Sequence, residues 1–273
     1  MLVPLDAAYQ ESTFGGKAVG LGDAIRAGLR VPPGVALGAP LVDALADGRD
    51  DALAMLLDSK HIPSGRLAIR SSAIGEDSAD ASFAGQHATK LNVVRTRIPE
   101  AVRAVWESGR SDSALAYRQR KGLPATPRMG IVVQVLIEPV AAGVLFTRNP
   151  VTGADERMIE ATWGLGEAVV NGMVVPDLFR LDAQGRLIEV TPGSKDVKVW
   201  YGDGEGTIEM PVAPELHSIP CLAPAVLDAL HEMAERCRRV WGADLDIEWA
   251  LGPDASVYLL QCRPITTLRS VAS

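Results

Sequence analysis

The sequence predicts a mixed α+β (mixed α/β) fold, with strands and helices interleaved rather than arranged as a doubly wound sheet. β-rich segments with the two-residue period of strands dominate the second half of the chain. Helical patterns stand between some of these segments, but they do not recur after every strand as regular βαβ units require. The 26 glycines and 18 prolines predict many turns.

Composition narrows the classes of function. At 273 residues, 47% hydrophobic and 22% charged, the chain is an ordinary globular protein of one large domain or two lobes. Its net charge of −7 argues against a nucleic-acid-binding face. Three scattered cysteines without a CxxC pair favour reduced thiols in the cytoplasm. We expect no signal peptide and no membrane span, since neither apolar pattern occurs.

Helices are expected mainly in the first half of the chain. The patterns predict a helix from Gly16 to about Gly28, further helices at 40–58, 98–108 and 111–121, and strands at 35–37 and 67–70. The proline-rich segment 123–127 is the best candidate for a link between lobes. We therefore expect two domains, 1–125 and 126–273.

The second half is expected to be a sheet with one long helix. Strands are predicted at 129–137, 142–147, 157–161, 177–182, 187–191 and 197–201, and a helix at 222–241. The chain then reads DIEWALGPDASVYLLQCRPIT, in which Gly-Pro-Asp separates two period-two runs as in a β-hairpin.

This hairpin carries polar residues on one face of an otherwise apolar ribbon. If the loop comprises residues 253–256, Glu248 lies opposite Gln261 and Asp246 lies opposite Arg263. One interpretation is a cross-strand ion pair on an exposed face, which stabilises a fold only weakly. The other is a metal and phosphate site, because carboxylate and amide oxygens suit Mg²⁺ and a guanidinium suits an anion.

Two basic residues in the first half stand where an anion could bind. Lys17 follows Gly15-Gly16 at the start of a helix, where backbone N–H groups and an ammonium would meet phosphate oxygens. Arg70 ends an apolar strand before a long Ser/Gly loop that could form a flap over phosphates. A surface lysine and a solvated arginine at a strand end are the alternatives.

Two further residues could contact a nucleotide. Gln134 lies within the buried strand VVQVL, where the backbone could bind an adenine edge, or where the amide could simply be satisfied by neighbouring backbone. Glu167 follows a strand and a glycine hinge and could bind ribose hydroxyls.

Taken together, these segments resemble the ATP-binding domain of the pyruvate phosphate dikinase and phosphoenolpyruvate synthase family, which includes rifampicin phosphotransferase. The resemblance runs in order through GGKAVGLGDAIRAGLRVPPGVAL, LAIRSSAIGEDSADASFAGQ, VVQVLIEPVAAGVLFTRNPVTG, IEATWGLGEAVVNG and DIEWALGPDASVYLLQCRPIT. It covers the chain from Gly15 to about Thr267 and implies an ATP-grasp fold, in which two lobes clasp ATP.

The resemblance also implies roles for individual residues. Lys17 and Arg70 match phosphate-binding positions, and Glu248 and Gln261 match the pair linked to Mg²⁺. Arg263 matches the arginine that stabilises the phosphoryl group during transfer. The flap over the triphosphate would contain Ser82, Gly85 and Gln86. Adenine would lie against Gln134 and Leu136, and Glu167 would contact the nucleotide.

In the family that the chain resembles, ATP is cleaved to AMP and its β-phosphoryl group passes to a histidine on a separate swivelling domain. This sequence carries no Gly-rich Thr-Ser-His segment of that kind, so we expect an acceptor protein or histidine domain supplied in trans. Two alternatives remain. One is a stand-alone ATP-grasp kinase or ligase that gives ADP, and the other is a non-catalytic nucleotide-binding subunit.

Overall fold

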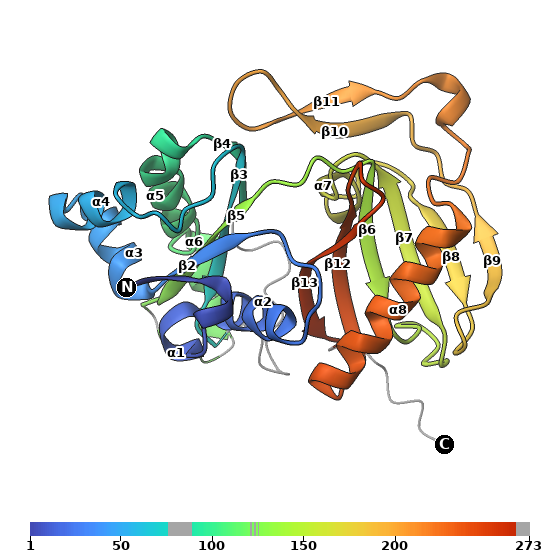
Figure 1. Cartoon of the computed structure of the whole chain (residues 1–273), viewed down its shortest axis with the longest axis horizontal. Coiled ribbons are helices and arrows are strands. Elements are labelled where there is room, and N and C mark those ends of the chain that lie inside the picture. Colours follow the sequence, from blue (N-terminus) through green and yellow to red (C-terminus); the bar gives the residue numbers. More distant parts are fainter. Residues whose placement is uncertain (76–88, 121, 123, 125, 266–273) are drawn as a thin grey trace. The chain divides into compact units, whose positions relative to one another are not determined.

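The computed structural model of the chain describes residues 1–75, 89–120, 122, 124 and 126–265. They form two compact units (Figure 1). The first unit comprises Met1–Arg26, Pro32–Leu136 and Tyr201–Gly206, and the second comprises Ala27–Val31, Ile137–Trp200 and Thr207–Ser273. Each unit contains its own antiparallel sheet together with helices, so the predicted mixed α+β class is confirmed.

The first unit contains a five-stranded sheet in the order β1-β2-β5-β3-β4. Its strands are β1 (Leu2–Pro4), β2 (Gly34–Leu37), β3 (Leu67–Ala73), β4 (Thr89–Val93) and β5 (Met129–Val135). Its helices are α1 (Glu11–Phe14), α2 (Gly16–Arg26), α3 (Ala39–Ala46), α4 (Asp50–Leu57), α5 (Ile98–Ser108) and α6 (Asp112–Arg120), with 3₁₀ turns η1 (Leu5–Ala7) and η2 (Arg95–Arg97).

The core of the first unit fixes which strand residues face away from it. Ile69 of β3 and Ile131 and Val133 of β5 are fully buried in one apolar cluster with residues of α3 and α5. Because side chains alternate along a strand, Arg70 and Gln134 lie on the opposite face of this sheet.

The helical segment expected at 40–58 consists of two separate helices, α3 and α4. Gly48 adopts φ +73° directly after α3. The N–H of Gly48 bonds to the carbonyl of Leu45, and the N–H of Arg49 bonds to the carbonyl of Ala44. These two bonds form the Schellman arrangement that ends a helix, and glycine adopts the required left-handed conformation without steric cost.

The second unit contains a six-stranded sheet in the order β13-β12-β6-β7-β8-β9 and a separate β10-β11 pair. Its strands are β6 (Ala141–Phe146), β7 (Arg157–Trp163), β8 (Asp177–Leu181), β9 (Leu187–Thr191), β10 (Val197–Tyr201), β11 (Thr207–Pro211), β12 (Leu245–Leu251) and β13 (Val257–Pro264). Its helices are α7 (Glu167–Val170) and α8 (Pro224–Trp241), with the 3₁₀ turn η3 (Pro214–Leu216).

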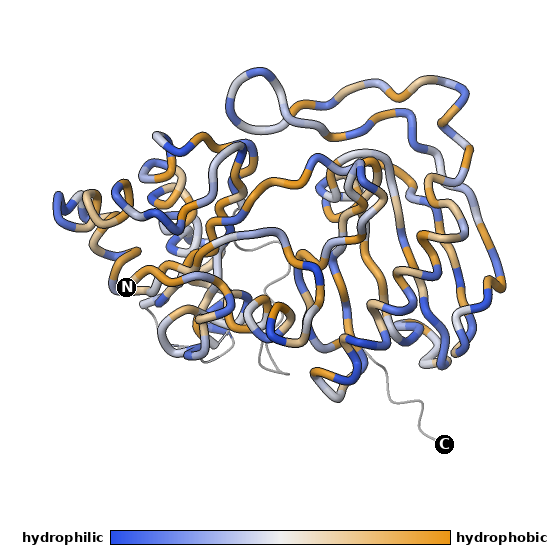
Figure 2. The backbone as a smooth tube through the Cα atoms, viewed as in Figure 1, coloured by the Kyte–Doolittle hydropathy of each residue, from blue (hydrophilic) through white to orange (hydrophobic). Residues whose placement is uncertain are grey.

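Helix α8 covers one face of the six-stranded sheet. Polar and apolar residues alternate along it with the helical period (Figure 2), and its buried residues are Leu227, Leu230, Met233, Ala234 and Cys237. Arg157 of β7 pairs with Glu235 of α8 at 2.5 Å, so residues of β7 in phase with Arg157 face the helix. Residues out of phase, such as Glu160, lie on the face away from α8.

The compact units divide after β5, whereas the predicted boundary lies before it. β5 is the central strand of the first sheet and pairs with both β2 and β3, so it belongs with the first unit. The division into domains 1–125 and 126–273 stays a prediction. Within the described part of the chain, no helix has the length and apolar character needed to cross a membrane.

Candidate functional site: a polar hairpin and a basic strand

The β12–β13 hairpin pairs its polar residues as the sequence predicted. Glu248 lies opposite Gln261, and Asp246 lies opposite Arg263. The predicted loop is one residue too short, because Leu251 pairs with Val257 and the loop therefore begins at Gly252. A register shift between Glu248 and Trp249 adds one residue to β13 and restores the predicted pairs.

Asp246 and Arg263 form an ion pair with one carboxylate oxygen left over. The Nε and Nη2 atoms of Arg263 lie 2.9 and 2.7 Å from Oδ2 of Asp246. The other oxygen, Oδ1, is buried and has no hydrogen-bond partner among the described residues. Burial raises the pKa of Asp246, the Arg263 charge opposes this shift, and the Glu248 charge adds to it. The interpretation as an exposed ion pair is therefore wrong: this carboxylate is largely buried and not fully satisfied.

Glu160 of β7 is a further carboxylate, and the sequence patterns did not single it out. It pairs with Val144 of β6, and Val144 pairs with Glu248 of β12, so all three residues share the face away from α8. Burial raises the pKa of Glu160, and the negative charge of Asp246 raises it further. A signal was present, since Glu160 and Thr162 alternate with the apolar Ile159 and Ala161. On β7, β12 and β13 this face therefore carries the three carboxylates of Glu160, Asp246 and Glu248 and the guanidinium of Arg263.

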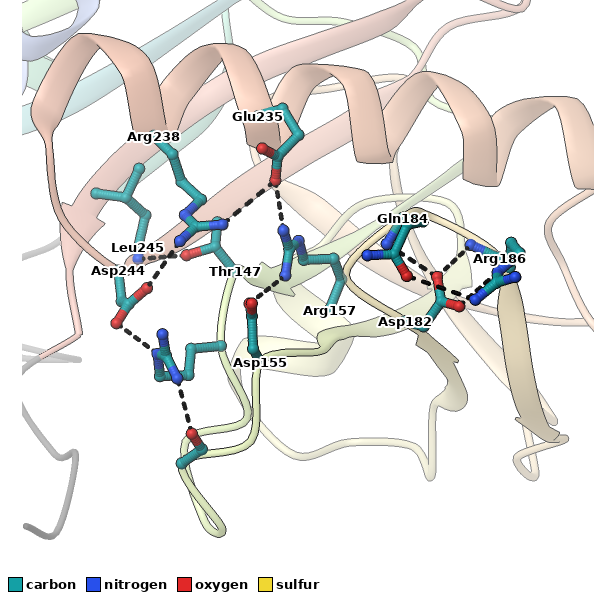
Figure 3. A network of polar contacts seen from close by, with 12 residues as sticks. Thr147, Asp155, Arg157, Asp182, Gln184, Arg186, Glu235, Arg238, Asp244 and Leu245 are labelled. Carbon is teal, nitrogen blue, oxygen red and sulfur yellow. Dashed lines mark hydrogen bonds and ion pairs between the residues drawn. The ribbon is translucent and has the colours of Figure 1, made fainter.

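A charge network supports the start of β12 (Figure 3). It joins Arg148, Asp155, Arg157, Glu235, Arg238 and Asp244. Arg148 pairs with Asp244 at 2.7 Å and donates to the carbonyl of Gly153 at 2.9 Å. The N–H of Leu245 donates to Oγ1 of Thr147 at 2.7 Å. These contacts fix the strand that carries Asp246 and Glu248.

In the first unit, Arg70 lies within β3 rather than at its end. The predicted strand stopped at Arg70, but β3 continues to Ala73, and only 8% of Arg70 is exposed. The alternative of a solvated strand end is therefore wrong. Arg70 pairs in register with Val132 of β5, on the sheet face that also carries Ser72. A buried arginine on a polar face is consistent with an anion site.

Lys17 is the second residue of α2, whose start is held against β3. The N–H of Ala18 donates to Oγ of Ser72 at 2.9 Å. Gly15 has φ +80°, and a Cβ at this position would lie 1.9 Å from the carbonyl oxygen of Ser72. No other residue fits so close an approach. Gly15 thus allows the start of α2 to lie against β3, the strand that carries Arg70.

Gln134 lies near the end of β5 in the first unit, and Leu136 directly follows this strand. Gln134 is 1% exposed and donates from Nε2 to the carbonyl of Pro32 at 3.0 Å, as one of its two interpretations expected. The N–H of Leu136 donates to the carbonyl of Arg66. Both residues therefore donate hydrogen bonds to backbone carbonyls of neighbouring segments. A role of this segment in adenine binding stays a prediction.

Glu167 begins α7 in the second unit and accepts a hydrogen bond from Oγ1 of Thr207 at 2.9 Å. The partner is 40 residues away in sequence, and no local pattern indicated it. The predicted flap residues Ser82, Gly85 and Gln86 lie outside the described residues.

Comparison with known families assigns the chain to a class of protein. Residues 38–273 match the family model of the pyruvate phosphate dikinase AMP/ATP-binding domain. The chain belongs to this family, as the resemblance predicted, and it is therefore an ATP-binding domain of the dikinase type.

Curated relatives agree with this assignment. A probable phosphoenolpyruvate synthase of Methanothermobacter thermautotrophicus is 42% identical over 205 residues, which cover 74% of this chain and 30% of that protein. A rifampicin phosphotransferase of a Streptomyces species is 39% identical, over 84% of this chain and 26% of that protein. The prodigiosin synthesizing transferase of Serratia marcescens is 36% identical, over 96% of this chain and 32% of that protein. The chain thus spans about a third or less of these relatives.

Solved structures with a similar arrangement are more distant. An L-amino acid ligase from Bacillus licheniformis matches 95% of this chain and 44% of its own, with 14% identity and a TM-score of 0.44. The VanG D-Ala:D-Ser ligase from Enterococcus faecalis matches 94% of this chain and 57% of its own, with 9% identity and a TM-score of 0.44. Likenesses at this level carry no argument about the site.

Proposed function

We propose that the chain binds ATP with Mg²⁺ and transfers the β-phosphoryl group of ATP to a histidine of an acceptor supplied in trans. The γ-phosphoryl group passes to water or phosphate, and AMP leaves. The observation that carries the proposal is the face of paired polar residues on β12 and β13, found in a chain of the dikinase ATP-binding family. A cytoplasmic location is part of the proposal, since Cys221, Cys237 and Cys262 form no disulfide.

The residues on this face fit Mg²⁺. Glu248 and Gln261 offer a carboxylate and an amide oxygen from opposite strands, both of which are hard ligands. The described residues contain no cluster of three or more His, Cys, Asp or Glu side chains that could hold a metal by themselves. Such a sparse set suits Mg²⁺, which binds through one or two protein groups together with waters and substrate phosphates. When bound, the ion would neutralise phosphate charge.

Three cations are proposed to bind the triphosphate. In the first unit these are Lys17, at the start of α2, and the buried Arg70 on β3. In the second unit Arg263 would stabilise charge on the phosphoryl group in flight, while Asp246 holds its guanidinium in place. Phosphoryl transfer depends mainly on such positioning and charge neutralisation. Ser82, Gly85 and Gln86 would close over the phosphates.

The nucleoside is proposed to contact two other segments. Adenine would bind beside Gln134 and Leu136, whose backbone lies at the end of β5. Glu167 would accept hydrogen bonds from the ribose hydroxyls. The curated relatives are about three times as long as this chain, which supports an acceptor histidine outside residues 1–273.

The product decides between this proposal and its alternatives. The purified chain is incubated with ATP, Mg²⁺ and a histidine domain taken from a phosphoenolpyruvate synthase, and nucleotides are separated by chromatography. We expect AMP and phosphate, with the acceptor histidine phosphorylated. Clean formation of ADP would instead support a stand-alone kinase or ligase, and ATP binding without turnover would support a regulatory subunit.

Substitution of Arg263 tests the role of the hairpin. Arg263→Ala should lower AMP formation about 10³-fold, because an arginine at a phosphoryl transition state contributes about 10³- to 10⁵-fold. The matched control is Arg186→Ala, which breaks an Arg–Asp pair in the turn between β8 and β9, with 78% of the Arg186 side chain exposed. Equal rates for the two variants would contradict the proposed role of Arg263.

A further inference from the structure

A buried asparagine gathers the glycine-rich loop between β10 and β11. Asn92 is 1% exposed, and its Nδ2 donates toward the carbonyls of Gly202, Gly204 and Gly206. Its Oδ1 accepts from Nη1 of Arg66. Neither the predicted site residues nor the proposed function uses this arrangement, which we call the Asn92 clasp.

The backbone of Asn92 is adapted to this contact. Asn92 has φ +60°, a conformation that asparagine tolerates better than most residues. The register of β4 against β3 shifts between Leu67 and Ile69, which places Asn92 at an irregularity of the ladder. Arg66 lies over the Tyr201 ring, with its Cζ atom 4.5 Å from the ring centroid, and so covers the start of the same loop. The loop is therefore held by part-buried contacts at its start, middle and end.

Thr207, which follows the Asn92 clasp, forms a hydrogen bond with Glu167, the residue proposed to bind ribose. Thr207 comes directly after Gly206, and its Oγ1 donates to Oε2 of Glu167 at 2.9 Å. This bond uses one carboxylate oxygen and restricts the rotamer of a side chain that begins a helix of only four residues. A held side chain loses less entropy when a ligand binds to it.

We infer that Thr207 is a positioning residue for Glu167, and that the Asn92 clasp fixes Thr207 in turn. The inference rests on the proposed function, because it gives Glu167 the ribose hydroxyls of ATP as its ligand. Thr207 itself does not touch the nucleotide in this scheme. It orients the carboxylate so that the site distinguishes ribose from deoxyribose.

The test compares the affinities for ATP, 2′-deoxy-ATP and 3′-deoxy-ATP, measured by calorimetry with Mg²⁺ present. Wild type should bind ATP about tenfold or more tightly than at least one analogue, since a hydroxyl bonded to a charged group is lost. Thr207→Val, which keeps the shape but removes the hydroxyl, should reduce that ratio to within about threefold. Thr207→Ser, which keeps the hydroxyl, should preserve it. A purely structural role would change all three affinities together.

Asn92→Ala tests the clasp, with hydrogen exchange as a second measurement. We expect faster exchange of the amides at 202–207 and a reduced preference for ATP over the same deoxy analogue. Glu205→Ala is the matched control. It removes only a 3.2 Å ion pair with Arg97, in which Glu205 is 46% exposed, so both measurements should match wild type.

The possible outcomes distinguish failure of the positioning role of Thr207 from failure of the proposed ATP binding. An unchanged ratio in Thr207→Val, or in Asn92→Ala despite faster exchange, overturns the positioning role and leaves ATP binding intact. Equal wild-type affinity for ATP and both analogues overturns the ribose contact of Glu167 and the inference with it. Failure of wild type to bind ATP at all overturns the proposed function as well.

Discussion

Two carboxylates in the six-stranded sheet each face a cation, but their surroundings differ. Asp177 of β8 and Lys195 are both fully buried, and Oδ1 of Asp177 lies 2.5 Å from Nζ of Lys195. The same oxygen accepts from the N–H of Gly193, and Oδ2 accepts from the N–H of Cys221. Both oxygens of Asp177 are thus satisfied by the chain itself.

Asp246 of β12 has hydrogen-bond partners for only one of its two carboxylate oxygens. Both bonds from Arg263 go to Oδ2, and Oδ1 is buried without a partner among the described residues. Native proteins rarely leave a buried carboxylate oxygen unpaired, because its lost hydration is not repaid. A closed pair such as Asp177–Lys195 serves the fold. In an open pair such as Asp246–Arg263, one carboxylate oxygen stays without a partner among the described residues.

The closed pair should have the largest effect on stability. Asp177→Asn leaves the ammonium of Lys195 buried without its counter-ion, which costs about 3–5 kcal/mol of unfolding free energy. It also removes an acceptor of the loop N–H groups at Gly193 and Cys221. The measurement is urea-induced unfolding followed by circular dichroism.

Glu189→Gln is the control for this prediction. Glu189 pairs with Arg180 of the same strand as Asp177, but 48% of the Glu189 side chain is exposed. Its replacement should cost less than about 1 kcal/mol. If Asp177→Asn were no more damaging than Glu189→Gln, the distinction between a closed and an exposed pair would fail.

The open pair should show the opposite balance between stability and activity. Burial raises the pKa of Asp246, so the folded state holds its ionised form at a cost that asparagine removes. Arg263 keeps 27% of its side chain exposed, so Asp246→Asn leaves its charge partly solvated and should lower the unfolding free energy by less than Asp177→Asn does. AMP formation should fall about 10²-fold, because Arg263 loses the contact that orients it. Unfolding and turnover are measured on the same preparation. A large loss of stability would place Asp246 with Asp177 as a structural residue.

The hairpin shows what local sequence can predict. Period-two alternation and one turn signal were enough to pair Glu248 with Gln261 and Asp246 with Arg263. The loop length was wrong by one residue, and the bulge beside Trp249 compensated for it. Alternation determines which residues share a face, but a bulge depends on how the two strands pack, which a single strand pattern does not contain.

Contacts distant in sequence lay beyond this kind of prediction. Thr207 and Glu167 are 40 residues apart, and Asn92 binds carbonyls more than 100 residues later. The sequence predicts a strand end at Arg70 because serines follow it. In the structure these serines continue β3, and Ser72 accepts a hydrogen bond from an N–H group at the start of α2. Polar residues are common in a strand when the face of the sheet on which they lie contacts other polar groups. Only the tertiary structure shows what that face contacts.

The smallest effect on stability should come from Glu160. It lies on the same face of the sheet as Asp246, and the described residues provide no ion-pair partner for it. Burial, and then the charge of Asp246, raises the pKa of Glu160 above its usual range. A raised pKa in the folded state means that the protonated form is the stabilising one. Its contribution is present below the ordinary pKa of glutamate and is lost as the pH rises through the raised value. Glu160→Gln should remove this part of the pH dependence.

Unfolding in urea at several pH values from about 2 to 7 measures the difference between wild type and Glu160→Gln. We expect wild type to lose stability relative to the variant as the pH rises, and the difference to level off above the raised pKa. Asp254→Asn supplies the opposite sign, because hydrogen bonds from Ser256 lower the pKa of Asp254 in the hairpin loop. Its contribution should vanish as the pH falls. If this difference changed with pH in the same direction for both variants, burial on the face of Glu160 and Asp246 would not destabilise the ionised carboxylates. The contrast between Asp246 and Asp177 would then rest on their hydrogen bonds alone.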